Sequence, residues 1–287
     1  MPDAFLELTP GVTLAVLGAA VLHASWNAII KSGDDVVLDT ALVALCGSVV
    51  CAPLLLFVAP PAPASWPYLA GSLAAHVAYY ATLAGAYRAG DLSHGYPIMR
   101  GTAPLLVAVA SMLFLGEGLS AAGWTGVLLI CGGVLSLALL RSASGGGPTR
   151  RATAWALANS AIIAFYTILD GRGVRLAGES IGYIAWSFSL MGLPFGLVVL
   201  AIKRGKLLAH ARRQWRRGVA GAALSGVAYG IAVWAMARAP VAAVAALRET
   251  SVIFAALIGA WLLKEGHLRP RLAGAAIVLA GVMLIRL

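Results

Sequence analysis

The sequence predicts an all-α integral membrane protein whose ten transmembrane helices form two inverted five-helix repeats. Three observations lead to this prediction. The 287 residues are 61% hydrophobic and only 11% charged, unlike the composition of most water-soluble domains. The apolar residues gather into ten runs of about 20 residues, the length that an α-helix needs to cross a hydrocarbon core. Residues of the first half also recur in the second half at a nearly constant spacing.

The ten runs account for nearly the whole chain. The predicted spans are 11–31, 38–59, 66–88, 92–114, 119–140, 152–171, 181–202, 216–237, 241–263 and 270–286. The two longest connections are Arg141 to Arg151, which contains Ser-Gly-Gly-Gly-Pro and is typical of a flexible linker, and the basic stretch from Lys203 to Arg217. We therefore expect a first repeat over 1–141, a linker over 142–151 and a second repeat over 152–287.

The internal repeat shows how the helices are organised. Two motifs recur 150 residues apart: Val77-Ala78-Tyr79 with Val227-Ala228-Tyr229, and Arg88-Ala89 with Arg238-Ala239. Others recur 148 residues apart: Arg100 with Arg248, Thr102 with Thr250, Glu117-Gly118 with Glu265-Gly266, Gly126 with Gly274, and Gly133-Val134 with Gly281-Val282. Because each repeat holds an odd number of helices, the second must enter the membrane upside down.

The basic residues are distributed unevenly between the two sides of the predicted membrane. Fifteen of the 21 Lys and Arg residues lie in connections after odd-numbered spans, four lie on the opposite side and two lie within spans. The positive-inside rule then places both termini outside. Topology and anionic lipid headgroups account for the net charge of +10, so we expect the lipid bilayer and not nucleic acid as a partner.

The sequence gives no indication of an enzyme or of a cofactor. Cys46, Cys51 and Cys131 lie in apolar runs without metal-ligand spacing, so we predict neither a metal site nor a disulfide. HExxH and Walker A motifs are absent. The chemistry must therefore come from polar side chains within the helices.

Arg100 and Arg248 are the principal candidates for substrate binding. An intramembrane charge is costly unless it is paired or faces a cavity, and a guanidinium group suits a carboxylate or phosphonate. The alternative is an ion pair of either arginine with Glu249 that joins the repeats. The two roles are compatible, because the single carboxylate of Glu249 can leave one guanidinium group free.

Glu249 is also the first candidate for proton coupling. Burial favours the neutral form of a carboxyl group and a nearby arginine favours its charged form, so arrival of a substrate can shift the balance. His94, His23 and His76 are further candidates for proton coupling, although an intrahelical histidine is also common as a packed hydrogen-bonding residue.

Polar and aromatic side chains recur at helical spacing in several spans and predict a water-accessible cavity between the repeats. The candidate substrate-binding residues of this kind are Trp26, Asn27, Tyr79, Tyr80, Tyr96, Tyr166, Trp186 and Tyr229. The polar stripe of the sixth span also includes Asp170. The tryptophans have packing or interfacial anchoring as an alternative role. Pro97 and Pro104 are candidates for gating, with a static kink as the alternative.

The chain resembles the EamA-type branch of the drug/metabolite transporter superfamily. The resemblance rests on Leu115-Gly116-Glu117-Gly118, Leu263-Lys264-Glu265-Gly266 and His23-Ala24-Ser25-Trp26-Asn27. We expect Glu117 and Glu265 to serve turns or contacts between repeats. The family's resolved members have cytoplasmic termini, opposite to the orientation that the charge distribution predicts, so the orientation stays open.

The resemblance implies a secondary active transporter of the bacterial inner membrane that moves a small polar metabolite, an amino acid or a small organic anion, by alternating access. Alternative substrates are a phosphonate-like anion and a cationic or amphipathic drug-like solute. The alternative function is a structural or signalling membrane protein without transport. We expect the proton as a candidate coupling ion, whereas substrate identity, direction of transport and oligomeric state are not specified by the sequence.

Overall fold

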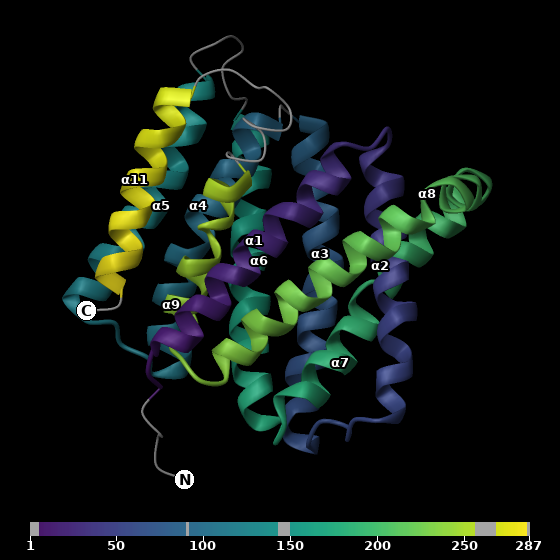
Figure 1. Cartoon of the computed structure of the whole chain (residues 1–287), viewed down its shortest axis with the longest axis horizontal. Helices are drawn as coiled ribbons and strands as arrows, with labels where there is room; N and C mark the ends of the chain where they lie inside the picture. The colour runs from purple at the N-terminus through teal and green to yellow at the C-terminus, as the bar shows by residue number, and fades with distance from the viewer. Residues whose placement is uncertain (1–5, 90–91, 143–149, 256–267, 286–287) are drawn as a thin grey trace.

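The computed structural model describes residues 6–89, 92–142, 150–255 and 268–285, which are helical and contain no β-strand (Figure 1). The first half contains α1 (Pro10–Lys31), α2 (Val36–Cys51), α3 (Trp66–Ala89), α4 (Leu92–Ala110) and α5 (Ala121–Ser142). The second half contains α6 (Arg150–Leu176), α7 (Ser180–Met191), α8 (Leu193–Met236), α9 (Val241–Arg248) and α11 (Leu268–Ile285). Short 3₁₀ turns occupy Ala52–Leu56 and Pro63–Ser65, and a π-helical turn at Ser111–Leu115 continues α4.

Local sequence signals set several helix ends. The Thr9 side chain caps α1 by accepting a hydrogen bond from the Val12 N–H at 3.3 Å. The Asp35 carboxylate caps α2 by accepting two backbone N–H groups of its first turn, at 3.0 and 3.1 Å. The π-helical turn after α4 ends at Gly116, whose φ of 71° is left-handed and therefore favours glycine.

Two of the predicted spans end at different residues in the structure. The predicted span 38–59 is α2 followed by a 3₁₀ turn, because Pro53 lacks the N–H needed to continue the α-helix. The predicted span 152–171 is too short, since α6 continues to Leu176. The predicted span 241–263 begins as α9, and its part from residue 256 lies outside the described residues.

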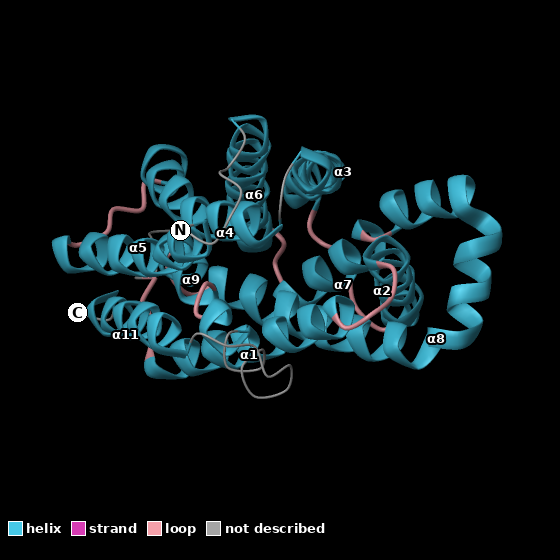
Figure 2. Cartoon of the chain, turned by 90° about the horizontal axis from the view of Figure 1, so that it is seen from above, coloured by secondary structure: helices cyan, strands magenta, loops and turns pink. Residues whose placement is uncertain are grey.

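The predicted basic connection from Lys203 to Arg217 is helical and belongs to α8. The predicted span 181–202 is divided between α7 and the start of α8, at a break that precedes Pro194. α8 then turns at Lys203, whose φ of −123° and ψ of 33° are not helical. Figure 2 shows α8 curving around the edge of the bundle.

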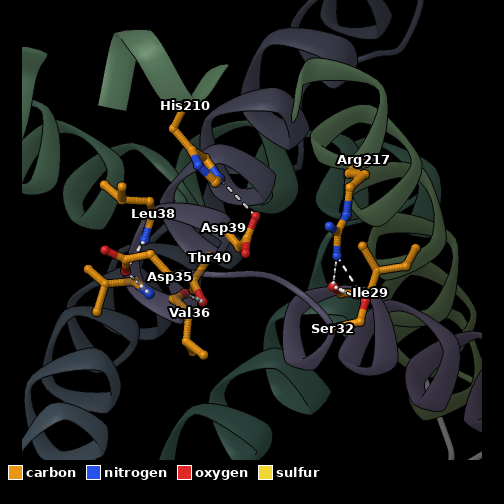
Figure 3. A network of polar contacts seen from close by, with 10 residues as sticks. Ile29, Ser32, Asp35, Val36, Leu38, Asp39, Thr40, His210 and Arg217 are labelled. Carbon is orange, nitrogen blue, oxygen red and sulfur yellow. Dashed lines mark hydrogen bonds and ion pairs between the residues drawn. The ribbon is translucent and has the colours of Figure 1, made fainter. Parts of the chain in front are cut away.

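The basic part of α8 is anchored to the α1–α2 turn (Figure 3). His210 Nε2 lies 2.8 Å from Asp39 Oδ1 of α2. Arg217 Nη2 donates to the Ile29 carbonyl at 2.7 Å and to the Ser32 hydroxyl at 2.9 Å. These contacts connect the second half of the chain to the first at one end of the bundle.

Five helical stretches of the described residues are long and apolar enough to cross a membrane. They are Pro10–Ile30, Val36–Leu56, Gly95–Leu115, Arg150–Leu176 and Ser180–Met236. α5 and α11 contribute shorter apolar stretches, Ala121–Ser136 and Ala273–Ile285. Large apolar side chains remain exposed on the surface, with exposed fractions of 75–84% for Leu56, Phe57, Phe114 and Ile202. Such a surface is typical of a protein surrounded by lipid.

The two halves of the chain pack extensively against each other: α3 contacts α6, α1 contacts α8, and α5 lies beside α11 (Figure 1). Close glycine contacts join α5 and α11. A Cβ atom at Gly126 would lie 2.7 Å from the Gly281 carbonyl oxygen, and one at Gly133 would lie 3.0 Å from that of Gly274. Because the later residue of α5 meets the earlier residue of α11, these two helices run antiparallel.

α9 lies in the interior of the bundle. All seven residues from Val241 to Leu247 are buried, with at most 6% exposed. A short helix that is apolar on every side is expected only where neighbouring helices surround it. α9 therefore carries the charged residues at its carboxyl end, Arg248 and Glu249, into the protein interior.

Candidate functional site

A buried ion pair joins the two halves of the chain. Arg100 lies on α4 and Glu249 directly follows α9. Arg100 Nε is 2.9 Å from Glu249 Oε2, and the two side chains are only 10% and 6% exposed. This is one of the two pairings that the sequence left open. Each partner of a buried ion pair depends on the other, because both have lost most of their hydration.

The ion pair leaves part of the guanidinium group without hydrogen bonds. The Arg100 Nε–H and Glu249 Oε2 do not meet hydrogen-bond geometry, and neither atom has another hydrogen-bond partner among the described residues. Arg100 Nη2 is also buried without such a partner there. An unsatisfied buried donor costs about 1–3 kcal/mol. These N–H groups would therefore gain considerably from an anionic ligand.

Two prolines flank Arg100 on the same helix. Pro97 and Pro104 are buried inside α4, which stays helical around both. Pro104 lies four residues after Arg100, so the Arg100 carbonyl lacks its usual helical N–H donor. α4 is therefore weakened next to the charged residue, and gating by these prolines stays a prediction.

Arg248 is a second guanidinium group close to the same pair. It is half-buried, and no described residue forms a hydrogen bond or ion pair with its side chain. It interacts electrostatically with Glu249 and with His23. Tyr96 of α4 interacts in the same way with Arg100 and Glu249. The site therefore combines two permanent positive charges with one carboxylate.

Four aromatic residues of α3 and α6, the aromatic cluster, lie together: His76, Tyr79, Tyr80 and Tyr166. The His76 ring stacks on Tyr166 with ring centroids 4.2 Å apart. Tyr79 meets Tyr166 edge-on at 6.2 Å and Tyr80 at 5.2 Å. Tyr80 also stacks on Phe195 of α8 at 4.4 Å. Candidates predicted separately in two spans therefore form one group.

Tyr166 connects this cluster to the charged residues. Its hydroxyl group interacts electrostatically with Arg248, Arg100, Asp170 and Glu249. Tyr166 therefore lies within electrostatic range of both arginines, of Glu249 and of a second buried carboxylate, so these groups share one polar region of the interior.

Asp170 of α6 is that second carboxylate, and sequence reasoning did not select it as a site residue. Its exposed fraction is 2%. The Tyr183 hydroxyl donates to Oδ1 at 3.0 Å, and the Tyr229 hydroxyl donates to Oδ2 at 3.3 Å. The predicted span ended at residue 171, which placed Asp170 at the membrane boundary. Because α6 continues to Leu176, the carboxylate lies deeper, where an ionisable residue is a strong functional signal.

The candidates of α1 hydrogen-bond within their own helix. Trp26 Nε1 donates to His23 Nδ1 at 3.2 Å, and Asn27 Nδ2 donates to the His23 carbonyl at 2.7 Å. His23 lies within electrostatic range of Arg100 and Arg248. Trp26 and Asn27 therefore bind His23, which is the residue of this group that interacts with the arginines.

Trp186 lies apart from the aromatic cluster. Its ring packs edge-on against Trp66, with ring centroids 5.1 Å apart, and Trp66 Nε1 donates to the Pro61 carbonyl at 3.1 Å. This contact agrees with the packing role that the sequence leaves open for Trp186. The side chain of His94, like residue Glu265, lies outside what the structure describes.

Glu117 forms a second contact between the halves, the Glu117–Arg175 contact, at the far end of α4. One carboxylate oxygen pairs with the Arg175 guanidinium group, and the other accepts the Val241 N–H at 2.8 Å where α9 begins. Arg175 also donates to the carbonyls of Met236 at 2.9 Å and Ala239 at 3.1 Å. Glu117 therefore contacts the second half of the chain, and its expected role in turns or contacts between repeats stays a prediction.

Comparison with known proteins gives a family and a fold. Residues 150–287 match the model of the EamA-like transporter family. The Pseudomonas aeruginosa protein described as "Uncharacterized protein PA1977" is 32% identical over 292 residues, which cover 99% of this chain and 96% of that protein. A protein of known crystal structure matches with a TM-score of 0.71 at 18% identity, over 96% of this chain and 98% of its own. That likeness concerns the fold alone.

Three findings agree with one another. They are the match to the family model, the relative whose alignment covers nearly all of both chains, and the apolar helices with exposed apolar side chains. The chain is therefore a multi-pass membrane protein that belongs to the EamA-like transporter family, of the drug/metabolite transporter kind.

Proposed function

We propose that this protein is a secondary active transporter of the bacterial inner membrane that moves a small polar metabolite bearing an anionic group, an amino acid or a small organic anion. The observation that carries the proposal is the excess of positive charge in the interior. Arg100 and Arg248 approach a single carboxylate, that of Glu249, and Arg100 keeps buried N–H groups without partners among the described residues.

Alternating access requires two halves that can move against each other, and we infer ten helices in two inverted repeats. The contacts between helices support this arrangement. If α1, α3 and α4 correspond to α6, α8 and α9, the pair α3–α6 becomes α8–α1, and α4–α6 becomes α9–α1, and all four pairs are in contact.

The glycine contacts of α5 and α11 support the same inference. The sequence repeat equates Gly126 with Gly274 and Gly133 with Gly281. Exchanging these equivalents turns the contact Gly126–Gly281 into Gly274–Gly133, and both contacts occur. The antiparallel course of the two helices is what inversion of the second repeat requires. The family match over 150–287 also supports a second repeat beginning close to residue 152.

The charged residues suggest how a substrate is held. An incoming carboxylate or phosphonate competes with Glu249 for Arg100 and is held from the other side by Arg248. Charge-assisted hydrogen bonds to arginine are strong and directional, which favours planar anions. Since Arg100 belongs to the first half and Arg248 to the second, a substrate that binds both would connect the halves and couple its own position to their movement.

Uptake into proteoliposomes tests this proposal. The purified protein would be reconstituted and assayed with labelled amino acids, organic anions, phosphonates and organic cations. We expect saturable uptake of an anionic or zwitterionic compound, reduced at least about tenfold by Arg100→Ala and by Arg248→Ala, because each removes a charge-assisted hydrogen bond.

The matched control is Arg238→Ala, which removes an exposed arginine whose guanidinium group lies over the Trp234 ring at 4.5 Å. Uptake should be unchanged in this variant. Saturable uptake of cations alone, or uptake that neither interior arginine affects, would contradict the assignment of the site. Absence of uptake for the whole panel would favour a membrane protein without transport activity.

A further inference from the structure

The buried carboxylate of Asp170 has no role in the substrate site described above, and its surroundings differ from those of Glu249. Among the described residues, no Arg or Lys forms an ion pair with Asp170. The hydroxyl groups of Tyr183 on α7 and Tyr229 on α8 donate to it, one to each carboxylate oxygen, and the hydroxyl group of Ser72 on α3 is a further neutral partner. An isolated buried carboxylate is costly, and binding a proton removes the charge.

The partners of Asp170 suit both of its protonation states. A tyrosine hydroxyl group donates one hydrogen bond and can also accept one. Both hydroxyl groups can therefore donate to the carboxylate, and either can rotate to accept the proton of the carboxylic acid. The Arg100 guanidinium group is a donor only and keeps its charge. Protonating Glu249 would thus leave a buried cation unpaired, whereas protonating Asp170 leaves every partner satisfied.

The groups that face Asp170 come from each helix packed around it. α3 contributes Ser72 and His76, α7 contributes Tyr183, and α8 contributes Tyr229. On α6 itself, Tyr166 interacts electrostatically with the carboxylate. Arg248, the last residue of α9, interacts electrostatically with His76. His76 is the only one of these neighbours with a neutral basic nitrogen to exchange a proton near physiological pH.

The tautomer of His76 follows from its hydrogen bond. His76 Nδ1 lies 2.8 Å from the Ser72 carbonyl oxygen, which can only accept, so Nδ1 carries the hydrogen. Nε2 is then the basic nitrogen of the neutral ring. The stacking of the ring on Tyr166 holds it in this position.

We propose that Asp170 is the proton-binding carboxylate of this protein, with the hydroxyl groups of Tyr183 and Tyr229 serving both of its protonation states and His76 as the neighbouring base. On release, the O–H bond of the carboxylic acid breaks, its electron pair stays on the carboxylate, and the proton passes to His76 Nε2 or to water. Calling this proton the coupling ion rests on the proposed transport function. The proton site itself does not.

Infrared difference spectroscopy tests the proton site directly, with the proton as the only ligand. The full-length protein in lipid nanodiscs would be titrated between about pH 5 and pH 9, while the C=O stretching band of protonated carboxylic acids is recorded. We expect a band that titrates in the wild type and in the double variant Arg100→Met with Glu249→Leu, which removes both charges of the buried ion pair, and that is absent in Asp170→Asn. Asp39→Asn is the matched control, since Asp39 is also buried but is paired with His210.

Tyr183→Phe gives a second readout if Asp170→Asn fails to fold. Removing one hydroxyl group should shift the frequency of the band without abolishing it, because the C=O stretch depends on its hydrogen bonds. A band that persists in Asp170→Asn, disappears in the double variant Arg100→Met with Glu249→Leu or never titrates would overturn the proposal. A titrating Asp170 band in a protein that transports nothing in the uptake panel would instead refute the proposed transport function and leave the proton site standing.

Discussion

Glu249 and Asp170 are both buried, with exposed fractions of 4% and 2%, but their partners are of opposite kinds. Glu249 meets the permanent charge of Arg100, with Arg248 nearby. Asp170 meets two neutral tyrosine hydroxyl groups. A nearby arginine favours the charged form of a carboxyl group, whereas hydroxyl groups can bind either form.

In the proposed mechanism, this difference separates two tasks within one polar region. The carboxylate of Glu249 would balance the positive charges to which an anionic substrate binds, so the substrate would compete with it. The carboxylate of Asp170 leaves those charges alone and would exchange a proton. Tyr166 interacts electrostatically with both carboxylates and both arginines. Protonation at Asp170 would therefore be sensed where the substrate binds.

The largest expected effect comes from removing the charge of Glu249. Glu249→Gln leaves the buried Arg100 guanidinium group without its counter-charge, and breaking a buried ion pair in this way costs about 3–5 kcal/mol. We expect a large decrease in the midpoint temperature of thermal unfolding in detergent. The double variant Arg100→Met with Glu249→Leu should recover most of this loss, because it removes both charges. A Glu249→Gln protein as stable as the wild type would show that the pair is not needed to compensate Arg100.

The sequence predicts the helices far better than it predicts these partners. Apolar runs give most helix positions, because burial in lipid requires long apolar segments. Hydropathy predicts a connection from Lys203 to Arg217 because it reports only the charge of this stretch. Its Lys, Arg, Leu and Ala residues nevertheless favour helix, and α8 continues through it.

The sequence cannot specify the ion-pair partner of Glu249, for a physical reason. The repeat places Arg100 and Arg248 at equivalent positions, so local sequence offers no reason for Glu249 to prefer either. Only the packing of α4 against α9 selects Arg100. Asp170 lies one residue before the end of the predicted span 152–171, and Arg172 and Arg175 follow it, so the sequence does not distinguish it from a residue at the membrane boundary. In the structure Arg175 is bound by Glu117 and by backbone carbonyls, which allows α6 to continue beyond Asp170.

An intermediate effect is expected at the tyrosine-bound carboxylate. Tyr183→Phe removes the hydroxyl group that donates to Asp170 Oδ1 at 3.0 Å. Leaving a buried acceptor without its donor costs about 1–3 kcal/mol. The unfolding midpoint should therefore fall by less than in Glu249→Gln. Asp170→Asn with Tyr183→Phe should cost less than the sum of the two single changes, since the lost contact is shared. Full additivity in this double-mutant cycle would contradict direct coupling between the two side chains.

The smallest effect on stability is expected at Arg248. Its charge has no ion-pair partner among the described residues, whereas the charge of Arg100 is paired with Glu249. Arg248 is half-buried and has no ion pair with a described residue, so Arg248→Gln removes a positive charge without leaving a carboxylate unpaired. We expect a change of less than about 1 kcal/mol in the free energy of unfolding. The same variant should lose most of its uptake of the anionic substrate identified in proteoliposomes. Thermal unfolding and uptake measured on one preparation would separate the two effects. A large loss of stability would mean that Arg248 compensates the charge of Glu249 as Arg100 does. Neither of the two arginines would then be available to bind a substrate.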